Sequence, residues 1–254
     1  MYILATDYDG TLNRGGVSER NHEAIRRFRE AGNLFGVVTG RDYYMYNTLV
    51  DHGVEFDFIL PFNGGMTINT EGKVTADYRA PNAENIIYEI AEMMTDYDSW
   101  LGCSIYKTHY TFHPHHPKGG RSCLPMDYTF AIPSFSMLNT GCRTKEAAAE
   151  CAARINRRFG HIITALQNGT AVDMPPRGID KGEGVARYAA AMGVPAENIY
   201  CAGDEMNDMA MISRFHGCAV SNARKEIKEA AEGVYEDIAE IIEHILELPH
   251  NNSF

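Results

Sequence analysis

The chain lacks any apolar stretch long enough to span a membrane. Its 254 residues contain no run that approaches the ~20 apolar residues of a transmembrane helix. The N-terminus has no basic region before an apolar segment, and aspartates follow within its first ten residues, so we expect no signal peptide. These absences, and a composition typical of globular proteins, predict a cytoplasmic protein that does not contact membranes.

Paired cysteine motifs and a dinucleotide-binding glycine motif are also missing. The six cysteines are scattered and form no C-x-x-C: Cys103, Cys123, Cys142, Cys151, Cys201 and Cys218. In a cytosolic chain they are expected to be free thiols rather than zinc ligands. No G-x-G-x-x-G follows the first apolar run, so a dinucleotide site is not favoured.

An excess of positive charge is absent as well. The formal net charge is −11, which argues against nucleic acid and acidic lipid surfaces as partners. Residues 81–178 carry nine basic and nine acidic side chains, whereas the remainder carries 14 basic and 25 acidic ones. The neutral segment also holds five of the ten histidines. This difference in charge suggests that 81–178 form a separate domain with its own task.

The most informative pattern present lies at the end of the first apolar run. Residues 2–6 read as a short buried strand, and Asp7 and Asp9 follow it directly, with Gly10 allowing a sharp turn. Ligands of open α/β sheets bind at the carboxyl ends of the strands. Two carboxylates crowded there repel each other unless a cation or a proton lies between them. An ordinary Asp-Gly turn is the alternative interpretation of this segment alone.

Three further segments have a similar form. The apolar run 34–38 ends in Thr39, Gly40 and Arg41, and the run 198–202 ends in the sequence GDEMND at 203–208. Between them, Lys181 stands at the start of a helix-like stretch. Strands and helices that alternate at this spacing predict a parallel sheet covered on both faces.

The four segments, in this order, resemble the motifs of the haloacid dehalogenase superfamily of phosphohydrolases. The GDxxND form and the large insert before Lys181 resemble the type IIB, Cof-like branch, and the resemblance covers essentially the whole chain. It departs at Thr6, where a large apolar residue is more usual. The resemblance implies an α/β fold with a Rossmann-like, doubly wound parallel sheet core and an inserted α/β cap domain.

The expected domain organisation is one domain interrupted by another. We assign residues 1–80 and 179–254 to the catalytic core and 81–178 to the inserted cap, which would control substrate specificity. The patterns predict helices after Ser18, over 83–94 and over 145–159, a hairpin with its turn at Asn168-Gly169, and a frayed tail at 249–254.

The acidic residues suggest phosphoryl transfer assisted by magnesium. We expect Asp7 to attack phosphorus and form an aspartyl-phosphate, and Asp9 to act as general acid and base. Attack by a carboxylate on a dianionic ester requires a cation, and Mg²⁺ prefers hard oxygen ligands. The resemblance implies that the Asp9 carbonyl and the Asp204 side chain bind the metal beside Asp7. Asp208, four residues after Asp204, can reach the same cation directly or through water.

Other residues are expected to bind the phosphoryl oxygens. Thr39 offers a hydroxyl and, with Gly40, backbone N–H groups. Lys181 offers a point charge that also reduces the repulsion among the acidic residues. Asn207 would hydrogen-bond either Lys181 or the phosphate. Each residue type also has an ordinary structural use, so the joint pattern carries the assignment.

Several substrate contacts are left as open alternatives. Arg41 contacts substrate or cap, or is a surface residue, and the resemblance suggests Asn63 near the substrate. We expect substrate contacts from the return hairpin at Asp173 and Met174, since it leads directly to Lys181. His113, His115 and His116 are interpreted as a polar loop rather than a metal site. The aromatic run at 106–112 is interpreted as cap core rather than a sugar-stacking surface.

The sequence therefore predicts a magnesium-dependent phosphatase that acts on a small phosphorylated metabolite, for example a sugar phosphate. One alternative is a phosphomutase of the same superfamily, which would return the phosphoryl group to its substrate. Another is a non-catalytic, receiver-like domain that is phosphorylated on aspartate. The substrate and the oligomeric state are not determined by the sequence.

Overall fold

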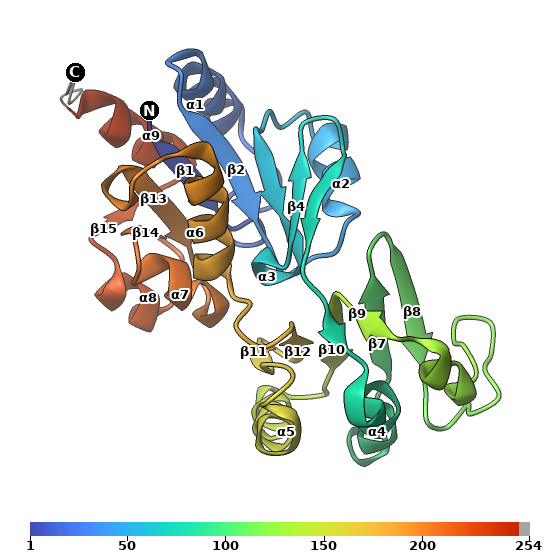
Figure 1. Cartoon of the computed structure of the whole chain (residues 1–254). Helices are drawn as coiled ribbons and strands as arrows, with labels where there is room; N and C mark the ends of the chain where they lie inside the picture. The colour runs from blue at the N-terminus through green and yellow to red at the C-terminus, as the bar shows by residue number, and fades with distance from the viewer. Residues whose placement is uncertain (249–254) are drawn as a thin grey trace.

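The computed structural model describes residues 1–248, and the expected fraying of 249–254 lies outside that range. Two sheets dominate the molecule, a larger one of eight strands and a smaller one of five strands, lying one beyond the other (Figure 1). This architecture confirms the predicted α/β class with a doubly wound sheet and an additional α/β region. No helix within 1–248 has the length and apolar character needed to cross a membrane.

The larger sheet has the order β15-β14-β13-β1-β2-β3-β4-β5. Neighbouring strands run parallel from β15 to β3, while β4 and β5 are antiparallel additions. The strands are β1 (Ile3–Thr6), β2 (Leu34–Val38), β3 (Phe58–Leu60), β4 (Met66–Asn69), β5 (Val74–Asp77), β13 (Ile199–Gly203), β14 (His216–Val220) and β15 (Gly233–Tyr235).

Helices cover both faces of this sheet because its central strands are apolar on both sides. In β1, Leu4 packs into one core, whereas Ile3 and Ala5 pack into the other. The first core also receives side chains from α1 (Glu19–Glu30), α2 (Met45–Asp51) and α9 (Ile238–Glu247). The opposite face is covered by α6 (Lys181–Met192), α7 (Met209–Ile212) and α8 (Lys225–Ala230). The predicted Ser18 cap of α1 is confirmed.

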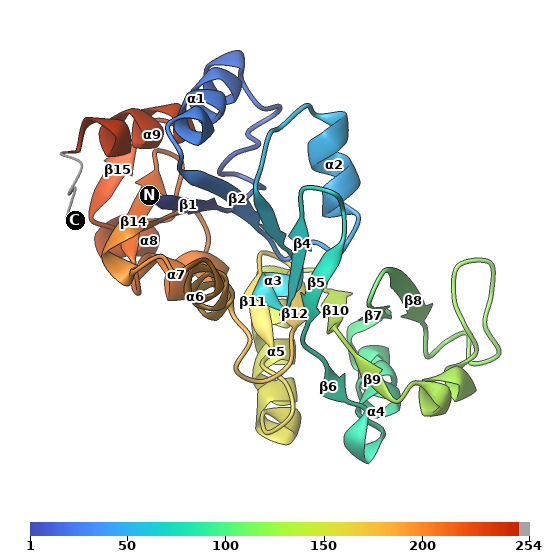
Figure 2. The same ribbon diagram turned by 45° about the horizontal axis from the view of Figure 1, so that its top comes forward.

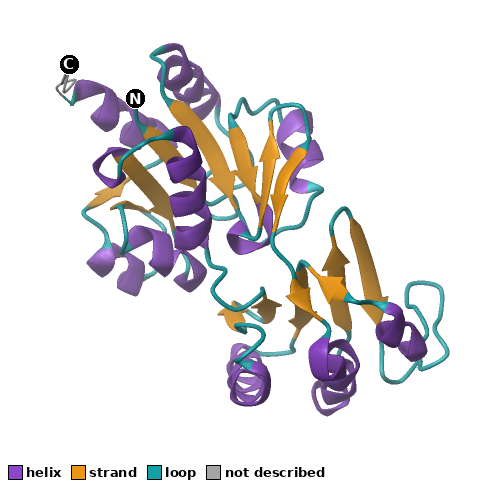
Figure 3. Cartoon of the chain, viewed as in Figure 1, coloured by secondary structure: helices purple, strands orange, loops and turns teal. Residues whose placement is uncertain are grey.

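The smaller sheet is antiparallel, with the order β11-β12-β10-β7-β8. Its strands are β7 (Leu101–Ile105), β8 (Thr108–Phe112), β10 (Met137–Gly141), β11 (Leu166–Asn168) and β12 (Ala171–Met174). The short pair β6 (Ala80–Pro81) and β9 (Ser134–Phe135) lies beside it. Figure 3 shows helices α4 (Ile86–Met93) and α5 (Lys145–Phe159) on the side of this sheet that faces away from the larger one. Its other side is therefore turned toward the larger sheet.

Short helical segments complete the described chain. They are α3 (Pro61–Gly64) and the 3₁₀ turns Ala83–Asn85, Met94–Tyr97, Met126–Ala131, Ala196–Asn198 and Met206–Asp208. Figure 2 shows α3 at the end of the larger sheet that is nearest to β11 and β12.

Local expectations met with mixed results. The helix 145–159 was predicted correctly, but the α-helix expected from 83 begins at Ile86, because Glu84 and Asn85 have positive φ. The hairpin at Asn168-Gly169 exists, yet Asn168 still belongs to β11 and the turn follows it. The domain boundaries at 80/81 and 178/179 stay a prediction, although every strand of the smaller sheet lies between them.

Candidate active site

Three strand ends meet at the carboxyl edge of the larger sheet. The central strand β1 pairs with both β2 and β13, so Asp7, Thr39 and Asp204 follow neighbouring strands. The Asp7 N–H donates to the Ala202 carbonyl oxygen at 2.9 Å, which extends the pairing one residue beyond β1. This is the switch point where the strand order reverses, the usual ligand position of such sheets.

Gly10 brings the first loop against Asp204. Its φ is +85°, and a Cβ atom there would lie 2.4 Å from Asp204 Oδ2. The Thr11 hydroxyl, one residue on, donates to Asp204 Oδ1 at 2.7 Å. The loop after β1 and the loop after β13 are thereby held together at the site.

Lys181 forms ion pairs with both Asp7 and Asp208. It is the first residue of α6 and is fully buried. Its Nζ lies 2.6 Å from Asp7 Oδ1 and 2.5 Å from Asp208 Oδ1. Burial lowers the pKa of the Lys181 ammonium, but the two carboxylates outweigh this and raise it above its ordinary value, so Lys181 is charged at neutral pH.

Two glycines allow the start of α6 to approach this position. A Cβ atom at Gly182 would lie 2.6 Å from the Ala210 carbonyl oxygen, and one at Gly184 would lie 2.6 Å from the Gly64 Cα. Neither backbone neighbour can move aside as a flexible side chain would. The sequence KGEG at 181–184 therefore combines the buried cation with the close packing that puts it in place.

Asp208 is buried, and both of its carboxylate oxygens accept hydrogen bonds. Its Oδ1 accepts from Lys181, and its Oδ2 accepts from the backbone N–H groups of Asp204 and Glu205 at 2.9 and 3.0 Å. Asp208 therefore fixes both the lysine and the loop that carries Asp204. The segment Met206–Asp208 is a 3₁₀ turn rather than the first turn of an α-helix.

Within residues 1–248, one group of side chains has ligand atoms close enough together to hold a metal ion. It consists of Asp7, Asp204 and Asp208, whose ligand atoms lie within 4.8 Å of one another. Asp7 Oδ2 and Asp204 Oδ2 accept no hydrogen bond from the described residues. A set of hard, acidic oxygens with two free atoms fits a divalent cation such as Mg²⁺.

The raised pKa values of Asp7 and Asp204 also indicate a site for a cation. Burial raises the pKa of Asp7 to about 8, opposed by Lys181 and reinforced by Asp208. Burial also raises the pKa of Asp204 to about 6, with the Thr11 hydrogen bond opposing it. Both values describe the protein without a cation. A divalent ion would favour the ionised carboxylates that nucleophilic attack and metal binding require.

Asp9 forms an ion pair with Arg41 above the buried cluster. Arg41 Nε and Nη2 donate to the two Asp9 oxygens at 2.7 and 2.6 Å, and the guanidinium lies 5.2 Å from the centre of the Tyr8 ring. The side chains of Asp9 and Arg41 are about half exposed, at 52% and 44%. Asp9 is thus accessible, unlike Asp7.

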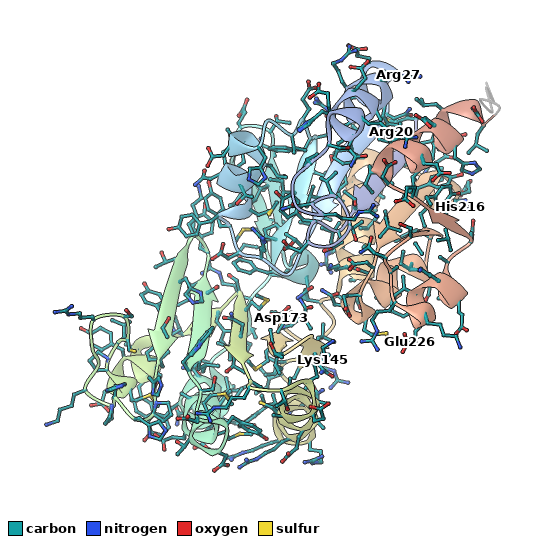
Figure 4. All side chains as sticks on the ribbon, turned by 180° about the vertical axis from the view of Figure 1, so that it is seen from behind. Arg20, Arg27, Lys145, Asp173, His216 and Glu226 are labelled. Carbon is teal, nitrogen blue, oxygen red and sulfur yellow. The ribbon has the colours of Figure 1, made fainter. Side chains whose placement is uncertain are left out.

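A cavity of about 220 Å³ opens over these residues. It is lined by Asp7, Asp9, Thr39, Gly40, Arg41, Asn168, Asp173, Glu205 and Asn207. Figure 4 shows the labelled Asp173 on the smaller sheet, in the region between the two sheets. Both sheets therefore contribute walls to one cavity.

Comparison with known families decides the class of protein. A family model described as haloacid dehalogenase-like hydrolase matches residues 4–241. The chain is a haloacid dehalogenase-like hydrolase. This confirms the predicted family and enzyme class, and it decides against the alternative of a non-catalytic receiver-like domain.

Relatives of this hydrolase cover nearly its whole length. It is 26% identical over 278 residues to the 5-amino-6-(5-phospho-D-ribitylamino)uracil phosphatase YwtE of Bacillus subtilis, covering 90% of this chain and 91% of that one. It is 24% identical over 240 residues to a phosphoglycolate phosphatase of Methanoculleus marisnigri, covering 93% and 91%. The solved structure of a subclass IIB sugar phosphatase superposes with a TM-score of 0.79 at 18% identity, covering 96% and 98%.

The backbone donor expected at Thr39 needs correction, and of the two partners expected for Asn207 the structure shows no bond to Lys181 among the described residues. The Thr39 N–H is not free, because it donates to the Leu60 carbonyl at 3.0 Å and so continues the sheet. The Thr39 hydroxyl accepts from the Arg41 N–H at 3.1 Å. Asn207 does not bond Lys181 but donates to Asn63 Oδ1 at 3.5 Å.

Of the residues expected to contact substrate, Asn63 lies beside the cavity, whereas Met174 does not reach it. Asn63 is buried with φ +53°, and its Nδ2 donates to Asp173 Oδ2 at 3.3 Å, so Asn63 links the two sheets beside the cavity. Met174 was a wrong prediction. Side chains alternate along a strand, and Met174 is fully buried in the hydrophobic core beneath the smaller sheet.

Asn168 and Glu205 line the cavity but were missed as site residues. Both were visible in the sequence: Asn168 begins the predicted hairpin turn, and Glu205 belongs to the GDEMND segment. What was missing was the position of the hairpin, which only its packing against the larger sheet provides.

Proposed function

We propose that this hydrolase is a magnesium-dependent phosphatase that cleaves a small phosphorylated metabolite through an aspartyl-phosphate on Asp7. The observation that carries the proposal is the position of the Asp7 carboxylate. Its Oδ1 is held by Lys181, while Oδ2 accepts no hydrogen bond from the described chain and Asp7 lines the cavity. A carboxylate fixed by a buried lysine beside an open cavity is oriented for attack on an ester that enters the cavity.

The first half of the reaction transfers the phosphoryl group to the protein. One oxygen of the Asp7 carboxylate forms a bond to phosphorus as the bond from phosphorus to the ester oxygen breaks. Asp9 donates a proton to the departing alkoxide, which leaves as an alcohol. Because Arg41 occupies both Asp9 oxygens in this structure, Asp9 must exchange at least one of these bonds for the substrate.

The second half regenerates the protein. A water molecule attacks the phosphorus of the aspartyl-phosphate, Asp9 takes its proton, and inorganic phosphate leaves as the Asp7 carboxylate is restored. Lys181 keeps Asp7 oriented throughout and offsets part of the negative charge. Asp208 acts through Lys181 and through the loop that bears Asp204.

Asp7 and Asp204, with the Asp9 carbonyl, would hold the Mg²⁺ ion, whose charge offsets the repulsion between the nucleophile and a dianionic ester. The phosphatases named among the relatives support a phosphate monoester as substrate. The structure of the related sugar phosphatase favours a small metabolite.

The test is release of inorganic phosphate from a panel of phosphorylated sugars, polyols and carboxylic acids by the purified full chain with Mg²⁺. Phosphate release with multiple turnovers supports the proposal. Conversion of a sugar phosphate to its isomer without phosphate release would instead identify a phosphomutase. Trapping ³²P on the wild-type chain, but not on Asp7→Asn, tests the covalent step.

A further inference from the structure

A second cavity of about 260 Å³ adjoins the first one. Gly40 and Arg41 line both cavities. The far wall of the second cavity belongs to the smaller sheet and includes Ser104, His109 and Asn139. A phosphate ester seated over Asp7 would direct its leaving group away from the buried cluster, and this cavity provides space for it.

The register of the smaller sheet puts these side chains on one face. Asp173 of β12 is opposite Asn139 of β10, and Asn139 is opposite Gly102 of β7. Ser104, two residues after Gly102, is opposite His109 of β8. Directly opposed residues share a face, as do residues two apart in a strand. Asp173 in the first cavity therefore continues into the polar side chains of the second.

Gly102 creates room in this row. A Cβ atom there would lie 2.2 Å from Asn139 Oδ1 and 2.7 Å from His109 Cε1. Asn139 and His109 thus lean over the strand from either side. Because Gly102 has no side chain, the polar side chains of Asn139 and His109 cover this part of the sheet face.

The polar atoms of this wall are incompletely used. Asn139 Oδ1 is buried and has no hydrogen-bond partner within the described chain. His109 Nδ1 is bonded to Ser104 Oγ at 3.0 Å, and no described residue bonds its Nε2. A buried acceptor without a donor is unfavourable, and the broad χ2 torsion of asparagine lets the amide turn toward a ligand.

The charges of the wall restrict the ligand. Arg41 is the one cationic side chain among the residues lining this cavity, and it is already paired with Asp9. Asp42 adds a carboxylate. Burial lowers the pKa of His109, with Asp42 opposing, so its ring is neutral at pH 7. A carboxylate or second phosphate on the leaving group would meet no cation here other than Arg41, whose charge is offset by the neighbouring Asp9.

We propose that Asn139, His109 and Ser104 form the leaving-group subsite of this enzyme, and that they select esters of uncharged, hydroxyl-bearing alcohols over esters with an anionic leaving group. A ligand hydroxyl donates to Asn139 Oδ1, and another bonds His109 Nε2. This inference rests on the proposed phosphatase function and adds the chemical class of its substrate.

The test compares kcat/KM of the full chain on five esters with Mg²⁺. Ribitol 5-phosphate and glucose 6-phosphate have neutral leaving groups, whereas phosphoglycolate and fructose 1,6-bisphosphate have anionic ones. The small artificial ester p-nitrophenyl phosphate needs no hydroxyl recognition. We expect the better neutral substrate to exceed both anionic ones by at least about tenfold, the scale of one lost polar contact.

Variants then locate the discrimination. Asn139→Leu keeps the side-chain volume but removes the acceptor, and we expect about 10- to 100-fold lower kcat/KM for the preferred substrate, mainly through KM. Hydrolysis of p-nitrophenyl phosphate should change by less than about twofold. His109→Phe should act in the same direction. The control Thr111→Val lies on the same face beyond Gly102, lines neither cavity, and should alter nothing.

Three results would overturn the inference in an active enzyme. The first is equal loss with the preferred substrate and with p-nitrophenyl phosphate in folded Asn139→Leu. The second is no loss with either, and the third is a preference for the anionic esters. A wild-type chain that releases phosphate from none of the five esters would instead refute the proposed function itself, and the subsite with it.

Discussion

The edge of the larger sheet and the facing side of the smaller one are built on different principles. At the edge, the ionic side chains of Lys181 and Asp208 are fully buried, and each of their hydrogen bonds is made with another charge or with a backbone N–H. On the facing side, Asn139 and His109 are uncharged and keep polar atoms without partners. The first arrangement permits one geometry, whereas the second leaves hydrogen bonds to be completed by a ligand.

The groups proposed for the chemistry and those proposed for selectivity therefore lie in different regions of the protein. A buried charge is tolerated only with close partners, so a cluster of them is rigid. Rigid orientation is what attack on phosphorus needs. Neutral polar groups cost less to leave unpaired, so a surface made of them can differ between relatives without unfolding the protein.

Replacing the nucleophile should have the largest effect. Asp7→Asn removes the attacking oxygen anion, and we expect kcat to fall by at least about 1000-fold on every ester alike. The amide can still accept a hydrogen bond from Lys181, and the variant has one fewer charge in a crowded cluster, so the urea midpoint should hold or rise. Substantial turnover by the purified variant would remove Asp7 from its assigned position in the mechanism.

Removing the divalent cation should also stop turnover on all substrates. Asp7 and Asp204 offer only hard oxygens, which suit Mg²⁺. We expect chelation to abolish phosphate release, Mg²⁺ to restore it and Ca²⁺ to inhibit, because Ca²⁺ expands its coordination and can engage both Asp7 oxygens. Steady-state rates after dialysis against a chelator provide the measurement. Full activity in the chelator, or equal rates with Ca²⁺, would contradict the metal assignment.

Breaking the buried ion pairs should affect stability more than any change on the facing side. Lys181→Met leaves Asp7 and Asp208 buried without their cation, and we expect a loss of about 3–5 kcal/mol in the free energy of unfolding. The matched control is Lys225→Met, whose ion pair with Glu229 is exposed and whose change should stay within about 0.5 kcal/mol. Urea titrations of both variants measure this. Similar stability for the two would show that the buried cluster is not held by Lys181.

Asp173 lies where the two regions meet, and it should affect substrates unequally. Asp173→Ala is expected to lower kcat/KM for the preferred substrate by about 10- to 100-fold, because its carboxylate lines the cavity and is positioned by Asn63. Hydrolysis of p-nitrophenyl phosphate should be much less affected. Equal loss on both esters would make Asp173 a structural residue.

The smallest expected effect is on the pH dependence of stability, and it arises from the Asp173 carboxyl group. Burial raises the pKa of Asp173 to about 6, with Asn63 opposing, whereas the unfolded chain has an ordinary aspartate. The folded state therefore binds more protons between about pH 4 and pH 6, and stability falls as the pH rises through that window. Asp173→Asn lacks this group. Its stability relative to wild type should rise from pH 4 to pH 6 and then level off in urea titrations, and a constant difference would refute the shift.

Much of the edge was predictable from sequence because strand ends in a parallel sheet converge. The apolar runs and the polar residues that follow them predict that Asp7, Thr39 and Asp204 lie together, and the structure brings them to adjacent strands. Neighbouring side chains in a strand point to opposite faces, so Asp173 and Met174 cannot both face the cavity. Asp173 lines it, and Met174 lies in the core. The bond between the Thr39 N–H and Leu60 was not visible in sequence, since it depends on the register of β2 and β3 beyond their last residues.

Local patterns thus determined the family, the alternation of strands and helices, and the residue types that we propose for the chemistry. Those features depend on neighbours in the chain: apolar periodicity, glycine turns and carboxylates at strand ends. Tertiary structure alone decided that Arg41 pairs with Asp9, that Lys181 reaches Asp208, and that Asn139 lines the second cavity with an unpaired oxygen. The first two contacts join residues remote in sequence that meet at the edge of the larger sheet, and the position of Asn139 follows from how the two sheets pack. No local pattern encodes either arrangement.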